Sequence, residues 1–242
     1  MTTAIISALP EEQAGLIQLL SNQERTTHIS RRLVSGLIHE KPVILTLAGV
    51  GKVAAAMTAT MLIERNKVER IIFTGVAGAV AAHVEVGDVV VGTEYLQHDM
   101  DASPLFPRHE IPYTGISRFK ADDRLNAIVL EALHAVFMPA TPTFDDVKPI
   151  KIHSGLIISG DRFVSSAAAV QILRSTLPDA LCVEMEGAAI AQVCHAYATP
   201  FTAMRSISDK ADDTASVDFP KFVSDFAGPL AVRFVDALLR RI

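Results

Sequence analysis

Short apolar runs that are typical of buried β-strands alternate along this chain with longer runs whose apolar residues have helical spacing. The predicted strands cover residues 4–8, 27–37, 42–47, 70–74, 88–95, 151–159, 180–182 and 201–204. The predicted helices cover residues 11–20, 52–65, 124–137, 167–176, 187–197 and 222–239. Strands that alternate with helices of this length predict an α/β protein, with a mostly parallel sheet and helices on both of its faces.

The length and composition limit the kinds of protein that this sequence can encode. A chain of 242 residues, half of them hydrophobic, fits one large domain over residues 1–242 with a sizeable core. A net charge of −5 argues against a nucleic-acid surface, which needs a basic stripe. The longest uncharged stretch, residues 187–204, predicts a buried helix, a turn and a strand, so no membrane span is expected.

The cysteines and the N-terminus predict a compartment. Cys182 and Cys194 lie in apolar segments, with neither metal-ligand spacing nor a disulfide framework. We interpret them as reduced core thiols and expect a cytoplasmic protein without a signal peptide. His98, Asp99 and Asp101 are close in sequence, but no second cluster completes the ligands of a zinc site, so no metal is predicted.

Three acidic residues follow or end apolar runs that predict buried strands. They are Glu12, Glu186 and Asp209. Acids at the ends of buried strands of an α/β sheet lie where such folds bind ligands, and an Asp beside Ser and Arg is a candidate general acid. The local pattern also fits simpler roles, because Asp209 can cap a turn and Glu12 and Glu186 can start helices.

Seven segments carry a resemblance to a known family. They are residues 5–12, 49–55, 74–78, 86–91, 159–163, 183–186 and 205–209. In this order they resemble the motifs of bacterial methylthioadenosine/S-adenosylhomocysteine nucleosidases, which belong to the purine-nucleoside phosphorylase superfamily. The resemblance implies a three-layer α/β/α sandwich with a mixed central sheet, like that of nucleoside phosphorylases. It also implies that water cleaves the N-glycosidic bond of adenosine thioethers.

The resemblance assigns the catalytic chemistry to two carboxyl groups. Asp209 is expected to hold a proton at neutral pH and to give it to the leaving purine at N7, with Ser208 as its hydrogen-bond partner. Glu12 is expected to deprotonate the attacking water. Two carboxyl groups that flank the bond with room for a water are the solution of an inverting glycosidase.

The resemblance also assigns substrate binding. Glu186 is expected to accept hydrogen bonds from the ribose hydroxyls, oriented by a charge-assisted hydrogen bond from Arg205. Met185 is expected to pack against the sugar as a soft apolar surface. Phe163 is expected to stack on adenine, while the backbone of Val164 distinguishes a 6-amino purine from a 6-oxo purine.

Other positions are expected to shape the pocket. We interpret residues 75–78 as a glycine turn, in which Gly78 lets the backbone approach the ligand closely. Leu9 and Val50 are expected to line an apolar pocket for the 5′-thio substituent. Residues 105–107 are candidates to wall the same pocket, from this subunit or its neighbour. Glu184 is expected to cap the helix that follows it.

The sequence leaves rival functions open. Phosphorolysis is disfavoured because the segment at residues 9–12 is acidic and would repel phosphate. Cleavage of aminodeoxyfutalosine is a second alternative, and a non-catalytic nucleoside-binding protein is a third. The leading prediction is a nucleoside hydrolase of methionine salvage that needs no cofactor, binds a small-molecule nucleoside, and forms a homodimer whose pocket is completed across the interface.

Overall fold

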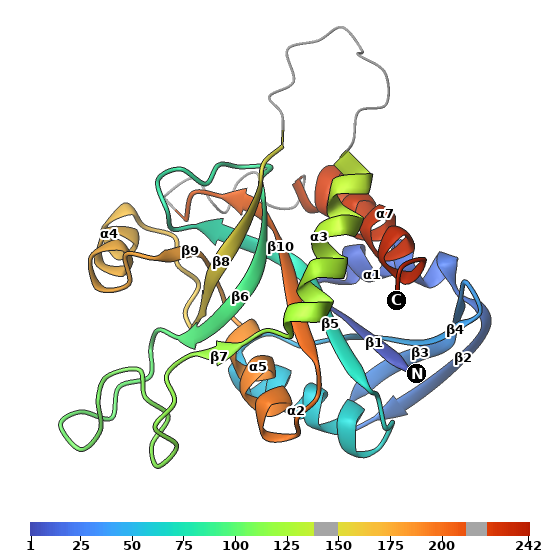
Figure 1. The fold of residues 1–242 in the computed structure, drawn as a ribbon, viewed down its shortest axis with the longest axis horizontal. Coiled ribbons are helices and arrows are strands. Elements are labelled where there is room, and N and C mark those ends of the chain that lie inside the picture. The colour runs from blue at the N-terminus through green and yellow to red at the C-terminus, as the bar shows by residue number, and fades with distance from the viewer. Residues whose placement is uncertain (138–149, 212–221) are drawn as a thin grey trace, which may run out of the picture.

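In the computed structural model, which describes residues 1–137, 150–211 and 222–242, ten strands form one mixed sheet with helices packed around it (Figure 1). The strands are β1 (Thr3–Ser7), β2 (Ser21–His28), β3 (Arg31–Ile38), β4 (Lys41–Leu47), β5 (Arg70–Ala79), β6 (Val89–Gln97), β7 (Phe119–Lys120), β8 (Ile152–Ser159), β9 (Ala180–Glu184) and β10 (Phe201–Asp209). The helices are α1 (Pro10–Leu19), α2 (Lys52–Glu64), α3 (Asp123–Phe137), α4 (Ala167–Thr176), α5 (Gly187–Ala196), η1 (Val223–Ala227) and α7 (Gly228–Leu239). The predicted α/β alternation is therefore confirmed. The prediction of a mostly parallel sheet was wrong, because the hairpins of β2, β3 and β4 and the pairs β5–β9, β6–β7 and β6–β10 are antiparallel.

Part of the sheet closes on itself. Its strand order is β10-β6-β8-β9-β5-β1-β4-β3-β2, with β7 paired to β6, and β10 also pairs with β5. The strands β5, β10, β6, β8 and β9 therefore form a closed ring, from which β1, β4, β3 and β2 extend as an open sheet. The carboxyl ends of the parallel strands β1, β5 and β10 lie at the same edge of the sheet.

Helices cover the sheet on two sides (Figure 1). The helices α1 and α3 both pack against α7, and the three helices bury residues such as Leu16, Val129 and Phe234. The helices α2 and α5 pack together on the other side. Strands covered on both faces read as continuous apolar runs, which is why β5 was recognisable in the sequence.

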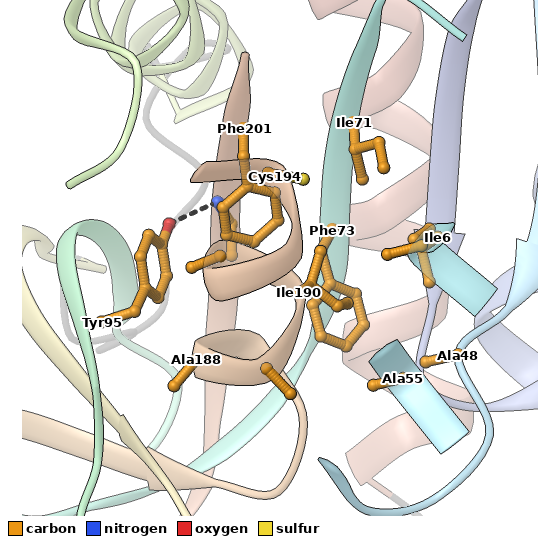
Figure 2. Close-up of a cluster of buried hydrophobic side chains, with 14 of the residues drawn as sticks. Ile6, Ala48, Ala55, Ile71, Phe73, Tyr95, Ala188, Ile190, Cys194 and Phe201 are labelled. Carbon is orange, nitrogen blue, oxygen red and sulfur yellow. Dashed lines mark hydrogen bonds between the residues drawn. The ribbon is translucent and has the colours of Figure 1, made fainter. Parts of the chain in front are cut away.

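The core beneath α2 and α5 is built from small and large side chains together (Figure 2). Ala55 and Ala188 let the helices approach the sheet, while Phe73 and Phe201 fill the space between them. Buried Tyr95 needs a partner for its hydroxyl group, and it accepts a hydrogen bond of 2.7 Å from the backbone N–H of Ala203.

Two sequence-based predictions about strands were wrong. The predicted strand at residues 27–37 is a hairpin, because Ile29 and Ser30 adopt positive φ angles of 42° and 63° and turn the chain between β2 and β3. Residues 75–78 are not a turn, because β5 continues to Ala79 and pairs with β10 along this stretch. The predicted surface insertion at residues 138–149 lies outside the described residues. No helix in the described ranges is long and apolar enough to cross a membrane.

Candidate active site

A pocket lies at the edge of the sheet where the carboxyl ends of β1, β5, β8, β9 and β10 meet. It is lined by Ala8, Leu9, Val50, Val76, Ala77, Gly78, Arg162, Phe163, Val164, Val183, Glu184, Met185, Glu186, Ser208 and Asp209. The structure thus brings together most of the predicted site residues. The two that do not line the pocket are Glu12 and Arg205, which are buried behind its wall.

Asp209 is the last residue of β10, and its carboxyl group is held from two sides. Ser208 Oγ donates to Asp209 Oδ2 at 2.6 Å, and the backbone N–H of Ala211 donates to Asp209 Oδ1 at 2.7 Å. The ladder to β5 shifts register between Ile207 and Asp209, so that Asp209 pairs with Gly78. A bulge of this kind re-aims a side chain, and here Asp209 lines the pocket.

Gly78 is required opposite this acid because any larger residue would meet it. A Cβ atom at position 78 would lie 2.9 Å from Asp209 Oδ1 and 2.8 Å from Ala211 Cβ. Both distances are shorter than side chains tolerate without movement. The glycine that the sequence suggested as a turn therefore serves as the space into which Asp209 fits.

Glu12 lies in the first turn of α1, where its carboxylate holds the loop that forms the pocket wall. Its Oε2 accepts hydrogen bonds of 3.1 Å from the backbone N–H groups of both Ala8 and Leu9. Only 1% of the residue is exposed. This burial raises the pKa of Glu12 to about 7, although the two N–H donors and the charge of Arg205 oppose it. The simpler interpretation, a helix-starting acid, is thus also correct, since Glu12 caps its own helix.

Glu186 lines the pocket just after β9, at the N-cap position of α5. Its Oε1 accepts a hydrogen bond of 2.8 Å from the backbone N–H of Gly51. Gly51 has a φ of +87°, a conformation that few other residues adopt readily, and this turn aims its N–H group at the carboxylate. Burial and the neighbouring carboxylate of Glu184 raise the pKa of Glu186.

The prediction that Arg205 hydrogen-bonds Glu186 was wrong, because Arg205 pairs with Glu184 instead. Arg205 Nη2 donates to Glu184 Oε2 at 2.8 Å, and both side chains are almost fully buried. Glu184 also accepts from the N–H groups of Glu186 and Gly187, so it caps α5 as expected. The arginine is therefore linked to the pocket through Glu184, which itself lines it.

Phe163 and Val164 line the pocket after β8, and Met185 lines it after β9. Phe163 is 49% exposed, which leaves its ring surface available for a flat ligand. Leu9 and Val50 complete an apolar lining. In this single chain, Leu105 is 84% exposed and residues 105–107 do not line the pocket.

Sequence reasoning missed several contributors to this site. Arg162 and Ala77 line the pocket, and Ser159 donates to the carboxylate of Glu184. All three lie within the segments that carried the family resemblance, so their positions were a usable signal. Within the described part of the chain, no group of three or more His, Cys, Asp or Glu residues is placed to hold a metal ion.

Comparison with known proteins shows the family to which this chain belongs. The family model of the Phosphorylase superfamily matches residues 2–240. A 5′-methylthioadenosine/S-adenosylhomocysteine nucleosidase from Anoxybacillus flavithermus is 37% identical over 229 residues, which cover 94% of this chain and 93% of the relative. A nucleosidase from Shewanella denitrificans with the same name is 35% identical over 242 residues, covering both chains completely.

Comparison with solved structures leads to the same family. The nucleosidase from Neisseria meningitidis, in complex with methylthio-immucillin-A, has a TM-score of 0.90 and 32% identity, and covers 100% of this chain and 99% of that chain. A futalosine hydrolase from Helicobacter pylori has a TM-score of 0.89 and 28% identity, covering 100% of this chain and 98% of that one. The chain therefore belongs to the Phosphorylase superfamily and, within it, to the family of 5′-methylthioadenosine/S-adenosylhomocysteine nucleosidases. The predicted fold class is thereby confirmed.

Proposed function

We propose that this protein hydrolyses the N-glycosidic bond of 5′-methylthioadenosine and S-adenosylhomocysteine, giving adenine and the thioribose product in methionine salvage. The observation that carries this proposal is that Asp209 and Glu186 line one pocket from two strand ends, with Glu12 buried directly behind its wall. The relatives named for this activity support it.

The proposed reaction balances with these groups. As the C1′–N9 bond breaks, its electron pair stays with the purine, which takes a proton at N7 from Asp209. The oxygen of a water molecule bonds to C1′ on the opposite face, and its proton passes to Glu12. The Ser208 hydroxyl, 2.6 Å from Asp209 Oδ2, can donate to or accept from the acid in both of its protonation states.

Substrate binding uses the remaining pocket residues. Glu186 accepts hydrogen bonds from the ribose hydroxyls, and Met185 packs against the sugar. Phe163 stacks on adenine, for which its exposed ring is suited. The backbone of Val164 reads the edge of the base. In this proposal the carboxyl groups of Asp209 and Glu12 supply and accept the protons, so the reaction uses neither a metal nor an organic cofactor.

The working form is proposed to be a cytoplasmic homodimer whose pocket is completed across the interface. Val53 and Met57 are exposed on α2, and Leu105 is exposed on the loop between β6 and β7, so apolar surface is available to a second copy. Residues 105–107 of the neighbouring subunit then join Leu9 and Val50 around the 5′-thio substituent. Light scattering after gel filtration tests the dimer, and Met57→Asp is expected to weaken it.

Futalosine-type nucleosides are a second candidate substrate class. The similarity to a solved futalosine hydrolase supports this alternative, and it keeps aminodeoxyfutalosine open as a substrate. The two substrates share the adenosine portion and differ at the 5′ position, so the lining by Leu9 and Val50 decides between them. Competition between the two nucleosides for one preparation of enzyme measures the preference.

The deciding experiment is adenine release from methylthioadenosine with and without phosphate. Release that is independent of phosphate supports hydrolysis. Release that requires phosphate would assign the chain to phosphorolysis, which is disfavoured because a buried glutamate, Glu12, lies behind the pocket wall. Adenine binding without release from either nucleoside would identify a binding protein.

A further inference from the structure

Glu184 holds a buried carboxylate that the proposed reaction does not use. It receives hydrogen bonds from Arg205 Nη2 at 2.8 Å, from Gly187 N at 2.9 Å, from Glu186 N at 3.2 Å, and from the Ser159 hydroxyl. Donors on all sides, one of them a cation, suit a carboxylate anion. Capping α5 requires only the backbone contacts, so the ion pair with Arg205 calls for a separate explanation.

Arg205 is a buried cation that pairs with Glu184. Only 1% of it is exposed, and its guanidinium lies 3.7 Å from the centroid of the Phe73 ring. Nη1 donates to the carbonyl oxygens of Phe73 and Met204. Burial raises the pKa of Glu12 and of Glu186, and the charge of Arg205 opposes this rise through space in both. The guanidinium also lies close to the segment that Glu12 holds, because a Cβ atom at Gly75 would lie 3.4 Å from Arg205 Nη1 and 3.2 Å from the Cβ of Ala8, whose N–H donates to Glu12. Arg205 thus acts on three carboxyl groups but hydrogen-bonds only one of them, Glu184.

We propose that Glu184 is a positioning residue that pairs with Arg205 and so keeps the guanidinium from pairing with Glu12 or Glu186. The inference rests on the proposed function, in which Glu12 takes a proton from water and Glu186 binds ribose. A carboxylate paired directly with arginine is a weak base. By occupying Arg205, Glu184 leaves Glu12 able to take a proton near neutral pH, and leaves Glu186 free for the sugar.

The test compares the pH dependence of kcat/KM for methylthioadenosine in the native protein, in Glu184→Gln and in Ser159→Ala. In Glu184→Gln, the neutral amide frees Arg205 to attract Glu12, so the acid limb is expected to move to lower pH by about one pH unit or more. Ser159→Ala removes a hydrogen bond to the same carboxylate but keeps its charge, so its acid limb should stay in place. Equal limbs in all three proteins would overturn the proposal.

A second readout separates this proposal from the proposed function. Titration of the Glu12 carboxyl carbon by NMR, with ¹³C-labelled glutamate and Glu12→Gln to identify the signal, needs no turnover. Arg205 from β10 and Glu11 from α1 are the charges that act on Glu12, and both remain in Glu184→Gln. A downward shift of the Glu12 midpoint supports the proposal even if methylthioadenosine is not cleaved. An unchanged midpoint refutes it. If Glu184→Gln does not fold, Glu184→Asp takes its place. The Asp side chain is too short to hold Arg205 at 2.8 Å, so the Glu12 midpoint is expected to shift in the same direction. An unshifted midpoint counts against the proposal.

Discussion

Replacing Glu12 by Gln should make the protein more stable at neutral pH while it abolishes turnover. The Gln side chain keeps an oxygen that can accept from the N–H groups of Ala8 and Leu9, so the loop in front of α1 keeps its support. What disappears is the buried charge. The variant therefore isolates the energetic cost of holding a buried carboxylate behind the pocket wall.

The magnitude follows from the pKa of Glu12, which burial raises from its ordinary value of 4.5 to about 7. Below pH 4.5 the group is protonated in both the folded and the unfolded chain. As the pH rises towards 7, the unfolded chain has released a proton that the folded chain keeps, so stability falls with pH. At about 1.4 kcal/mol per pH unit, the loss reaches about 3 kcal/mol above pH 7, as an upper bound.

The assay is urea unfolding of the native protein and of Glu12→Gln at pH 5 and pH 8, at one fixed protein concentration because a dimer would link stability to concentration. Because a small part of the loss is already present at pH 5, the free-energy difference between the two proteins should grow by up to about 2.5 kcal/mol in favour of the variant between these pH values. Glu24→Gln, on the exposed strand β2, is the matched control and should show a flat difference. A flat difference for Glu12→Gln as well would refute the reasoning.

Three further substitutions test the site. Asp209→Asn should fold normally but lower kcat by about 10²- to 10⁴-fold, since the amide cannot give a proton; normal turnover would remove Asp209 from the mechanism. Gly78→Ala should lower the free energy of unfolding by about 1–3 kcal/mol and reduce kcat, because its Cβ would lie 2.9 Å from Asp209 Oδ1. An unchanged free energy of unfolding and an unchanged kcat would contradict this tight contact. Phe163→Ala should raise KM about tenfold with little change in kcat or stability, since stacking a base on an aromatic ring contributes about 1–3 kcal/mol of binding free energy. An unchanged KM would show that Phe163 does not stack on the base.

The sequence predicted most of the helices and buried strands, but it did not predict all of strand β2, whose residues are mostly polar. Strand β2 is almost entirely exposed, so it lacks the apolar alternation by which strands are recognised. Its turn at Ile29 and Ser30 uses positive φ angles without a glycine, and no local signal marked it. Strand β5 was cut short at Gly75 because glycine usually ends a strand, whereas here a Cβ would lie 3.2 Å from the Cβ of Ala8.

The residues of the site could be predicted from the sequence, but their hydrogen-bond partners could not. Most of the predicted residues line one pocket, because strand ends of a parallel sheet meet at one edge. The partner of Arg205 was misassigned between Glu184 and Glu186, which are two residues apart. The choice depends on where β9 ends: Glu184 is still in the strand and faces Arg205, while Glu186 has turned into the cap of α5. A sequence does not reveal that boundary to one residue.

The closed ring of β5, β10, β6, β8 and β9 has a consequence for how the enzyme can be changed. Every strand of the ring is laddered on both sides, so shifting one of them requires breaking two sets of hydrogen bonds. At the strand ends themselves, Glu184 stays paired with Ser159 of β8 and Asp209 with Gly78 of β5, so both are preorganised before any ligand arrives. In the proposed site, adaptation to a different 5′ group falls instead to the loops that present Leu9 and Val50. A new substrate preference could then be built on those loops while Asp209, the proposed proton donor, stays at the end of a strand of the closed ring.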